Sequence, residues 1–283
     1  MYQESISRKR PGCIVFLLDR SDSMRRPWNW GRETLAQGAA AAINGILMEL
    51  CIRATKGAGL CYHYFDVGIF GYGTRPAAGG EGVESAFAGR LANRTLVPIG
   101  EIRDNHLGVR EVPSVDLGAS VQMPVWVEPV YGYRTPMCQA IAVAGEHVYE
   151  WAQAHQDSFP PIIVNITDGM VTDDPLDGAS LGDWAKRLTS ISTRDGQALL
   201  FNVFVAPQAA SEVVFPASGL GLPEPGPALF DISSPLPGPM IRNAASDGVP
   251  TVPGARGFAF NVTDPAMLVK ILEIGTRITT RGD

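Results

Sequence analysis

The chain has 283 residues, of which 45% are hydrophobic and 18% are charged, so it is long enough to bury a full hydrophobic core. Its formal net charge is −6 and its basic residues are scattered, which excludes the broad basic surface that nucleic-acid binding requires. The four cysteines show no CxxC spacing, so we expect free thiols rather than a zinc site, and a reducing, cytoplasmic setting.

The N-terminal part of the chain begins an alternation of strands and helices. A continuous apolar run at 13–18 predicts a strand that is buried on both faces. From Thr34 to Leu50 apolar residues recur at helical spacing, which predicts a helix that covers one face of a sheet. A second strand is predicted at 62–72. Strand, helix and strand in this order imply a right-handed crossover and a parallel pair.

The alternation continues after a less regular stretch. Thr135 and Pro136 form a good helix start, with Thr as N-cap and Pro at the first helical position. A helix is also expected after Ser180, which forms a capping-box pattern with Asp183. The remaining predicted elements are strands at 161–167, 198–205 and 257–262 and a helix after Asp264.

This order predicts an α/β fold, with a doubly wound, mostly parallel central sheet flanked by helices. No internal repeat or domain boundary is visible, so we expect residues 1–283 to form a single domain. Two stretches are expected to be irregular insertions. The first, about 73–134, is rich in Gly and holds short possible strands at 95–99 and 125–130. The second, about 206–256, is rich in Pro, Gly and Ser and shows no convincing period. The apolar runs of the sequence are predicted to fall short of the roughly 20 residues needed to cross a bilayer, so no membrane contact is expected.

The most informative stretch is Asp19-Arg20-Ser21-Asp22-Ser23, directly after the first predicted strand. In open α/β sheets ligands bind in the crevice beyond the carboxyl ends of the strands. An acid and two hydroxyls at alternating positions of such a loop can direct their oxygens to one hard cation. Carboxylate and alcohol oxygens suit Mg²⁺.

Two later loops carry further oxygen ligands. Thr135 lies at the start of a predicted helix, and Thr167-Asp168-Gly169 follows another buried strand. Together with the first motif, this arrangement resembles the von Willebrand factor A domain and its metal-ion-dependent adhesion site. The family pattern is Asp-x-Ser-x-Ser after the first strand, a lone Thr in a later loop, and an Asp after the fourth strand. The resemblance covers about 13–205 and points to the intracellular bacterial members of the family.

The resemblance implies a function as well as a fold. Ser21, Ser23 and Thr135 would offer side-chain oxygens to Mg²⁺ or Mn²⁺, and Asp19 and Asp168 would act directly or through water. In the family a carboxylate of a partner protein fills the open coordination position. The chain would then be a non-enzymatic adaptor, and its partner an ATPase, kinase or phosphatase of a bacterial stress or defence system.

Each of these residues also has a simpler interpretation. Ser21 and Ser23 are suited to capping a turn, Thr135 to capping a helix, and Asp168-Gly169 to an ordinary turn. The sequence also departs from the family pattern at Asp22, where a small residue is common. Asp173 and Asp174 add negative charge nearby, for which a solvated acidic turn is the favoured interpretation over direct ligation.

An enzyme is the competing hypothesis. Phosphatases and phosphotransferases of the haloacid-dehalogenase type also place an acid after the first strand and bind Mg²⁺ there. That family carries Asp-x-Asp, in which the second acid is the general acid. Here the corresponding residue is Ser21, which cannot take that role.

Overall fold

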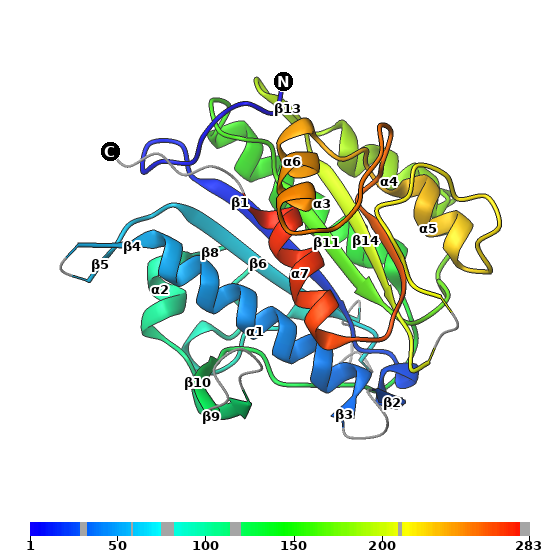
Figure 1. The fold of residues 1–283 in the computed structure, drawn as a ribbon, viewed down its shortest axis with the longest axis horizontal. Coiled ribbons are helices and arrows are strands. Elements are labelled where there is room, and N and C mark those ends of the chain that lie inside the picture. Colours follow the sequence, from blue (N-terminus) through cyan, green and yellow to red (C-terminus); the bar gives the residue numbers. More distant parts are fainter. Residues whose placement is uncertain (29–32, 58, 75–81, 114–119, 209–210, 278–283) are drawn as a thin grey trace.

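The computed structural model describes residues 1–28, 33–57, 59–74, 82–113, 120–208 and 211–277 (Figure 1). At its centre lies an eight-stranded sheet in the order β15-β16-β14-β11-β1-β6-β7, with β8 also paired to β6. The strands of this sheet are β1 (Gly12–Asp19), β6 (Phe65–Tyr72), β7 (Val83–Ser85), β8 (Val97–Pro98), β11 (Ile162–Thr167), β14 (Leu199–Val205), β15 (Val213–Val214) and β16 (Phe258–Val262).

The five long strands of this sheet are parallel to one another, and the short β7, β8 and β15 pair antiparallel to them. All eight residues of β1 are buried, because helices cover both faces of the sheet. Its side chains alternate between two hydrophobic clusters: Phe16 belongs to one, and Val15 and Leu17 to the other. The fully apolar run in the sequence therefore reflects a strand with no solvent face.

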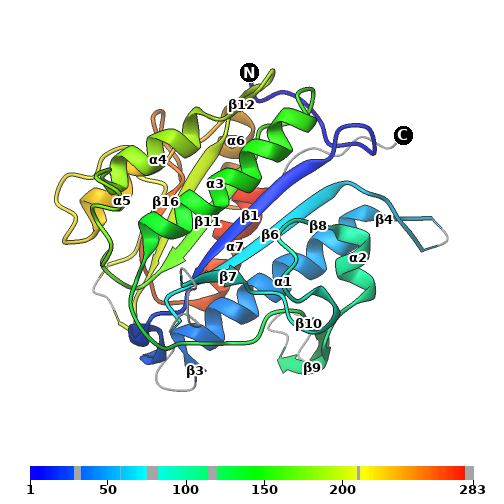
Figure 2. The same cartoon turned by 180° about the vertical axis from the view of Figure 1, so that it is seen from behind.

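The helices form a layer on each side of the sheet, as the two opposite views show (Figures 1 and 2). One layer contains α1 (Leu35–Ala54), α2 (Ile99–Asp104), α6 (Gly238–Ser246) and α7 (Pro265–Thr276). The other contains α3 (Met137–Ala154), α4 (Leu181–Ser190) and α5 (Gly226–Ile232). The predicted fold class, a doubly wound and mostly parallel sheet flanked by helices, is confirmed.

Shorter elements lie around this core. Four two-stranded pairs are formed by β2 (Pro27–Trp28) with β3 (Glu33–Thr34), β4 (Thr55–Lys56) with β5 (Leu60–Cys61), β9 (Gly108–Pro113) with β10 (Ser120–Val125), and β12 (Ser192–Thr193) with β13 (Gly196–Gln197). The 3₁₀ turns are η1 (Asp22–Arg25) and η3 (Gly89–Leu91). The expected capping box of α4 is present between Ser180 and Asp183.

Two expectations about the chain need correction. The expected short strand at 95–99 is present as β8, but no strand forms at 126–130, because β10 ends at Val125. The described parts of 73–134 and 206–256 also hold elements that were not expected: β7, α2 and β9, and β15, α5 and α6. None of these elements exceeds nine residues, which is too short for a clear hydrophobic period. In addition, α1 is long and apolar enough to cross a bilayer by length and composition. Most of it is buried between the sheet, α2, α7 and β10, which explains its apolar composition.

Candidate metal centre

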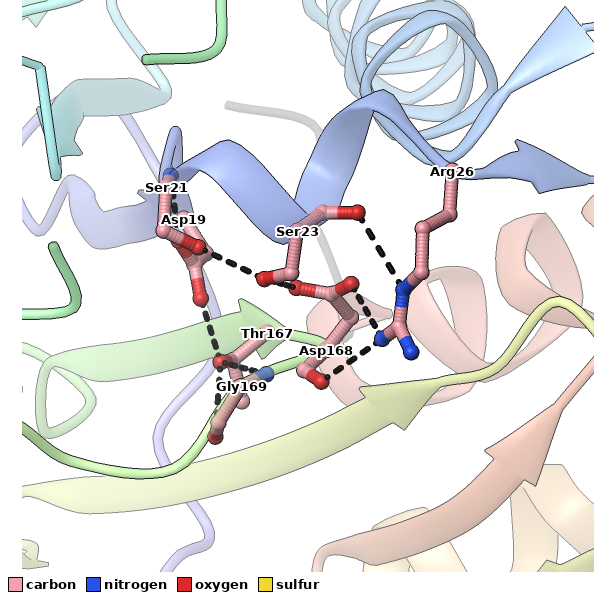
Figure 3. Close-up of polar contacts among 7 residues, drawn as sticks. All are labelled: Asp19, Ser21, Ser23, Arg26, Thr167, Asp168 and Gly169. Carbon is pink, nitrogen blue, oxygen red and sulfur yellow. Dashed lines mark hydrogen bonds and ion pairs between the residues drawn. The ribbon is translucent and has the colours of Figure 1, made fainter. Parts of the chain in front are cut away.

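The candidate site lies at the carboxyl end of two adjacent strands. Asp19 ends β1, and Asp168 follows β11, which pairs with β1 in parallel with Leu18 opposite Ile166. The chain after Asp19 turns through η1, where Ser23 lies. Sheet register therefore brings residues 149 positions apart in sequence to one edge, as the close-up shows (Figure 3).

A third loop, which carries Thr135, is attached to the first by main-chain contacts. The Gly132 amide donates to the Arg20 carbonyl at 2.8 Å, and Ser21 forms a parallel bridge with Tyr133. Gly73 at the end of β6 permits this approach. It has a φ of +105°, and a Cβ there would lie 2.7 Å from the Ser21 nitrogen. A side chain at this position would push the loops apart.

Asp19 is fully buried, and both of its carboxylate oxygens accept hydrogen bonds. The Ser21 amide donates to Oδ1 at 2.7 Å, and the Thr167 hydroxyl donates to Oδ2 at 2.6 Å. Burial raises the pKa of Asp19 to about 6, although the hydrogen bonds from Thr167 and Ser21 lower it and the nearby Asp168 adds a further rise. Burial removes water from the ionised carboxylate, which is unfavourable, and a cation beside it would stabilise the ionised form.

Ser21, Ser23 and Asp168 form a continuous chain of oxygen atoms. The two serine hydroxyls lie 3.0 Å apart, and the Ser23 hydroxyl donates to Asp168 Oδ1 at 2.7 Å (Figure 3). The interpretation of the serines as simple turn caps is not supported, because Ser21 is the N-cap of η1 without a side-chain capping bond. Neighbouring oxygen ligands of an octahedral Mg²⁺ are themselves about 3.0 Å apart.

Thr135 does not cap α3, contrary to the prediction. The helix begins at Met137, its N-cap is Pro136, and no side chain of the cap residue bonds to it. Asp173 from the loop after β11 supplies the capping instead, accepting from the Cys138 amide at 3.1 Å and the Gln139 amide at 2.8 Å. This arrangement leaves the Thr135 side chain for the site.

Gly169 shows where the Thr135 hydroxyl lies. A Cβ at Gly169 would be 2.9 Å from Thr135 Oγ1 and 3.5 Å from Asp19 Oδ2. The Thr135 hydroxyl and the Asp19 carboxylate thus lie on either side of one small space, and Gly169 has no side chain that would fill it. The five residues selected from the sequence, Asp19, Ser21, Ser23, Thr135 and Asp168, all contribute to this one edge of the sheet.

The additional acids near the site have other tasks. Asp22 pairs with Arg25 across 3.4 Å on the surface of η1. Asp174 accepts a hydrogen bond from the Leu181 amide at the start of α4, at 3.2 Å. Residues 173–174 were expected to be a solvated acidic turn in preference to ligands; the structure adds that both carboxylates accept main-chain hydrogen bonds at helix starts. These acids do not enlarge the ligand set.

Arg26 belongs to the site and was missed from the sequence. Its Nη2 donates to Asp168 Oδ2 at 2.6 Å and to the Asp168 carbonyl at 3.2 Å, and its Nε donates to the Ser23 carbonyl at 3.3 Å (Figure 3). The pair Arg25-Arg26 is visible in the sequence. Nothing local distinguishes the residue that contacts Asp168 from the one that pairs with Asp22.

The donor set fits a hard divalent cation. It consists of two carboxylates and three hydroxyls, with no imidazole or thiolate, and such oxygen donors suit Mg²⁺ or Mn²⁺. Within the described residues no cluster of three or more His, Cys, Asp or Glu side chains is suited to hold a metal. The proposed site is not a cluster of that kind, because three of its five residues are Ser or Thr and only two are acids.

The chain was compared with known proteins by sequence and by structure. No known family and no curated protein matches its sequence. Among solved structures it is similar to the pilus adhesin SpaC of Lactobacillus rhamnosus GG (14% identity, 71% of this chain, TM-score 0.41) and to the manganese-loaded TRAP protein of Plasmodium vivax (14%, 69%, 0.33). A third similar structure is the human COPII-coat protein Sec24c (13%, 71%, 0.37). This chain spans 25%, 57% and 27% of these chains, respectively, and at these scores the likeness assigns neither a family nor a site.

Proposed function

We propose that this chain is a protein-interaction module of the von Willebrand factor A type that binds a partner through a divalent cation. Asp19, Ser21, Ser23, Thr135 and Asp168 would hold Mg²⁺ or Mn²⁺. When bound, the cation supplies an electrophilic position for a carboxylate of the partner. The observation that carries the proposal is the chain of side-chain oxygens from Ser21 through Ser23 to Asp168, beside the buried Asp19.

The surface around these loops supports a protein partner. Met170, Tyr131 and Tyr133 have 62%, 49% and 45% of their surface exposed, and all three lie in the loops that form the site. Large exposed apolar and aromatic side chains near a polar centre are typical of protein interfaces. Arg25 and Arg26 are exposed on the same loops, which favours an acidic side chain on the partner.

Enzymatic phosphoryl transfer is the weaker hypothesis. In a haloacid-dehalogenase site a second acid, two residues after the first, acts as the general acid. Here Ser21 takes that place, and its hydroxyl is hydrogen-bonded to Ser23. None of the loops at 19–26, 131–135 and 167–174 contains a lysine to stabilise a transferred phosphoryl group. We therefore favour a non-enzymatic adaptor.

The proposed setting follows from the family resemblance. We place the chain in the cytoplasm of a bacterium, in a multi-protein stress or defence system, with an ATPase, kinase or phosphatase of that system as partner. We propose no role in nucleic-acid binding and none at a membrane. The net charge of −6 is consistent with this choice.

Affinity capture from native lysate tests the proposal. Wild-type protein would be compared with Asp19→Ala in Mg²⁺ and with wild type in chelator. Asp22→Ala is the matched control, because Asp22 lies in the same loop but pairs with Arg25 on the surface. We expect a carboxylate-bearing partner that binds wild type and Asp22→Ala in Mg²⁺ and is lost in the other two samples. Hydrolysis of a phosphate monoester by wild type that is lost in Asp19→Ala would instead support the enzyme.

A further inference from the structure

Arg26 connects the two strand-end loops that contribute acids to the site. Its backbone is fixed on both sides: its amide donates to the Ser23 carbonyl at 3.0 Å, and its carbonyl accepts from the Leu35 amide at the start of α1 at 3.0 Å. From this position its guanidinium reaches Asp168 Oδ2 at 2.6 Å, an ion pair with good hydrogen-bond geometry. Arg26 is thus built into the site and is not a freely moving surface charge.

The two members of this ion pair differ in their surroundings. The Asp168 side chain has no exposed surface, whereas the Arg26 side chain is 46% exposed. One carboxylate oxygen of Asp168 accepts from Ser23 and the other accepts from Arg26. The guanidinium therefore pairs with Asp168 Oδ2 from the solvent side. Asp168 Oδ1 stays with Ser23 in the oxygen cluster.

The charges of the site can be counted from these contacts. Asp19 and Asp168 contribute two negative charges and Arg26 one positive charge, which leaves one net negative charge when both acids are ionised. A divalent cation would turn this into one net positive charge. Without Arg26 the same cation would leave a neutral site. The guanidinium thus opposes cation binding and favours a subsequent anion.

We propose that Arg26 is a positioning residue that makes cation binding dependent on the partner: it weakens the affinity of the free site for Mg²⁺ or Mn²⁺ and strengthens the attraction of the loaded site for a carboxylate. This inference rests on the proposed cation site. It adds that the free protein binds the cation weakly because the positive charge of Arg26 repels it. A partner carboxylate restores the charge balance that Arg26 has shifted.

Titration with Mn²⁺ alone, followed by the loss of the free Mn²⁺ signal in electron paramagnetic resonance, tests the inference. We expect Arg26→Gln to bind Mn²⁺ about tenfold more tightly than wild type, since a unit charge near a divalent ion is removed. Arg26→Lys, which keeps the charge, should stay within about threefold of wild type. Arg25→Gln is the matched control: it removes the same charge one residue away, from a side chain that pairs with Asp22 and not with Asp168.

A second readout follows the anion. Replacing chloride by acetate at constant ionic strength should tighten Mn²⁺ binding in wild type more than in Arg26→Gln. A residue that only stabilises the fold would not tighten cation binding when it is removed. If Arg26→Gln does not fold, as judged by circular dichroism, Arg26→Met takes its place, because it keeps the packing of the aliphatic stem.

The outcomes separate this inference from the proposed function. Tighter binding by Arg26→Gln but not by Arg25→Gln supports the inference. If Asp19→Ala abolishes binding and Arg26→Gln binds no more tightly than wild type, the cation site stands and the role of Arg26 is overturned. If neither wild type nor Arg26→Gln binds Mn²⁺, or if Asp19→Ala binds as wild type does, both are overturned.

Discussion

The hydroxyl of Thr167 donates a hydrogen bond of 2.6 Å to the carboxylate of Asp19, and both groups are buried at the ends of the adjacent strands β11 and β1. Thr167 also accepts from the Gly169 amide at 3.1 Å. A single side chain thus orients Asp19 and the loop that carries Asp168. The geometry of the site depends on a residue that is not itself in the set of proposed ligands.

Thr167→Val tests this orienting role. Valine has the same shape but cannot donate to Asp19 or accept from Gly169. We expect about 1–2 kcal/mol lower free energy of unfolding and about tenfold weaker Mn²⁺ binding. Urea denaturation and Mn²⁺ titration measure the two effects. Thr167→Ser keeps the hydroxyl and serves as control. Mn²⁺ binding that is equal in Thr167→Val and wild type would show that Asp19 needs no such support.

Gly169→Ala tests whether Thr135 and Asp19 border one volume. The new methyl group would lie 2.9 Å from Thr135 Oγ1, so the hydroxyl would have to move. We expect Mn²⁺ binding to weaken at least about tenfold and the free energy of unfolding to fall by about 1–3 kcal/mol, because the added methyl group must displace the buried Thr135 side chain. Gly132→Ala is the control, since a Cβ there meets no atom within 4 Å. Unchanged binding in Gly169→Ala would remove Thr135 from the site.

Asp173→Ala tests the assignment of this acid as a helix cap. Loss of its bonds to the Cys138 and Gln139 amides should lower the unfolding free energy by about 1 kcal/mol. Because Asp173 caps α3 and is not a proposed ligand, Mn²⁺ affinity should change by less than about threefold. Chemical denaturation and Mn²⁺ titration of the same sample give both values. A large loss of Mn²⁺ affinity at full stability would instead make Asp173 a ligand.

We expect the stability of the fold to depend on pH through an ion pair at the opposite end of β6, where His63 Nε2 lies 2.6 Å from Asp66 Oδ1. The hydrogen bond to Asp66 raises the pKa of His63. Burial alone would raise the pKa of Asp66, but the bonds from His63 and Trp151 lower it below its usual value. The histidine contribution is complete below its unfolded pKa of about 6.5 and is lost as pH rises through the folded value. The aspartate contribution is present above about pH 4 and is lost as pH falls through its lowered value.

The pair should therefore stabilise the fold most between about pH 4 and 6.5. His63→Ala should be less stable than wild type at pH 5.5, by less than about 1 kcal/mol because His63 is half exposed, and the difference should shrink above pH 8. Thermal unfolding of both proteins across this range provides the measurement. A difference that grows with pH would contradict the assignment.

The sequence predicted the parts of the site that depend on local pattern. The buried strand that ends at Asp19 and the spacing of Ser21 and Ser23 are visible as an apolar run followed by alternating oxygens. Asp168 also follows a buried strand, and it was chosen because the three loops together resemble the family pattern. Asp168 could be assigned to the site without knowing the order of the strands in the sheet.

The parts that were missed depend on contacts between distant segments. Thr135 was expected to cap α3 because its neighbour is Pro136, but Asp173, from a loop 38 positions later, occupies that role. Arg26 pairs with Asp168 across 142 positions, and its neighbour Arg25 has the same local pattern. The elements within 73–134 and 206–256 are too short to show a period. Tertiary packing decides each of these features.

Diffraction from a crystal soaked in Mn²⁺, recorded at a wavelength at which manganese scatters anomalously, would test the central claim most directly. We expect one strong anomalous peak at the strand ends, within coordination distance of the Ser21 and Ser23 hydroxyls and beside Thr135, and its loss in Asp19→Ala. A peak at another place, or none at this edge of the sheet at saturating Mn²⁺, would contradict the proposed cation site.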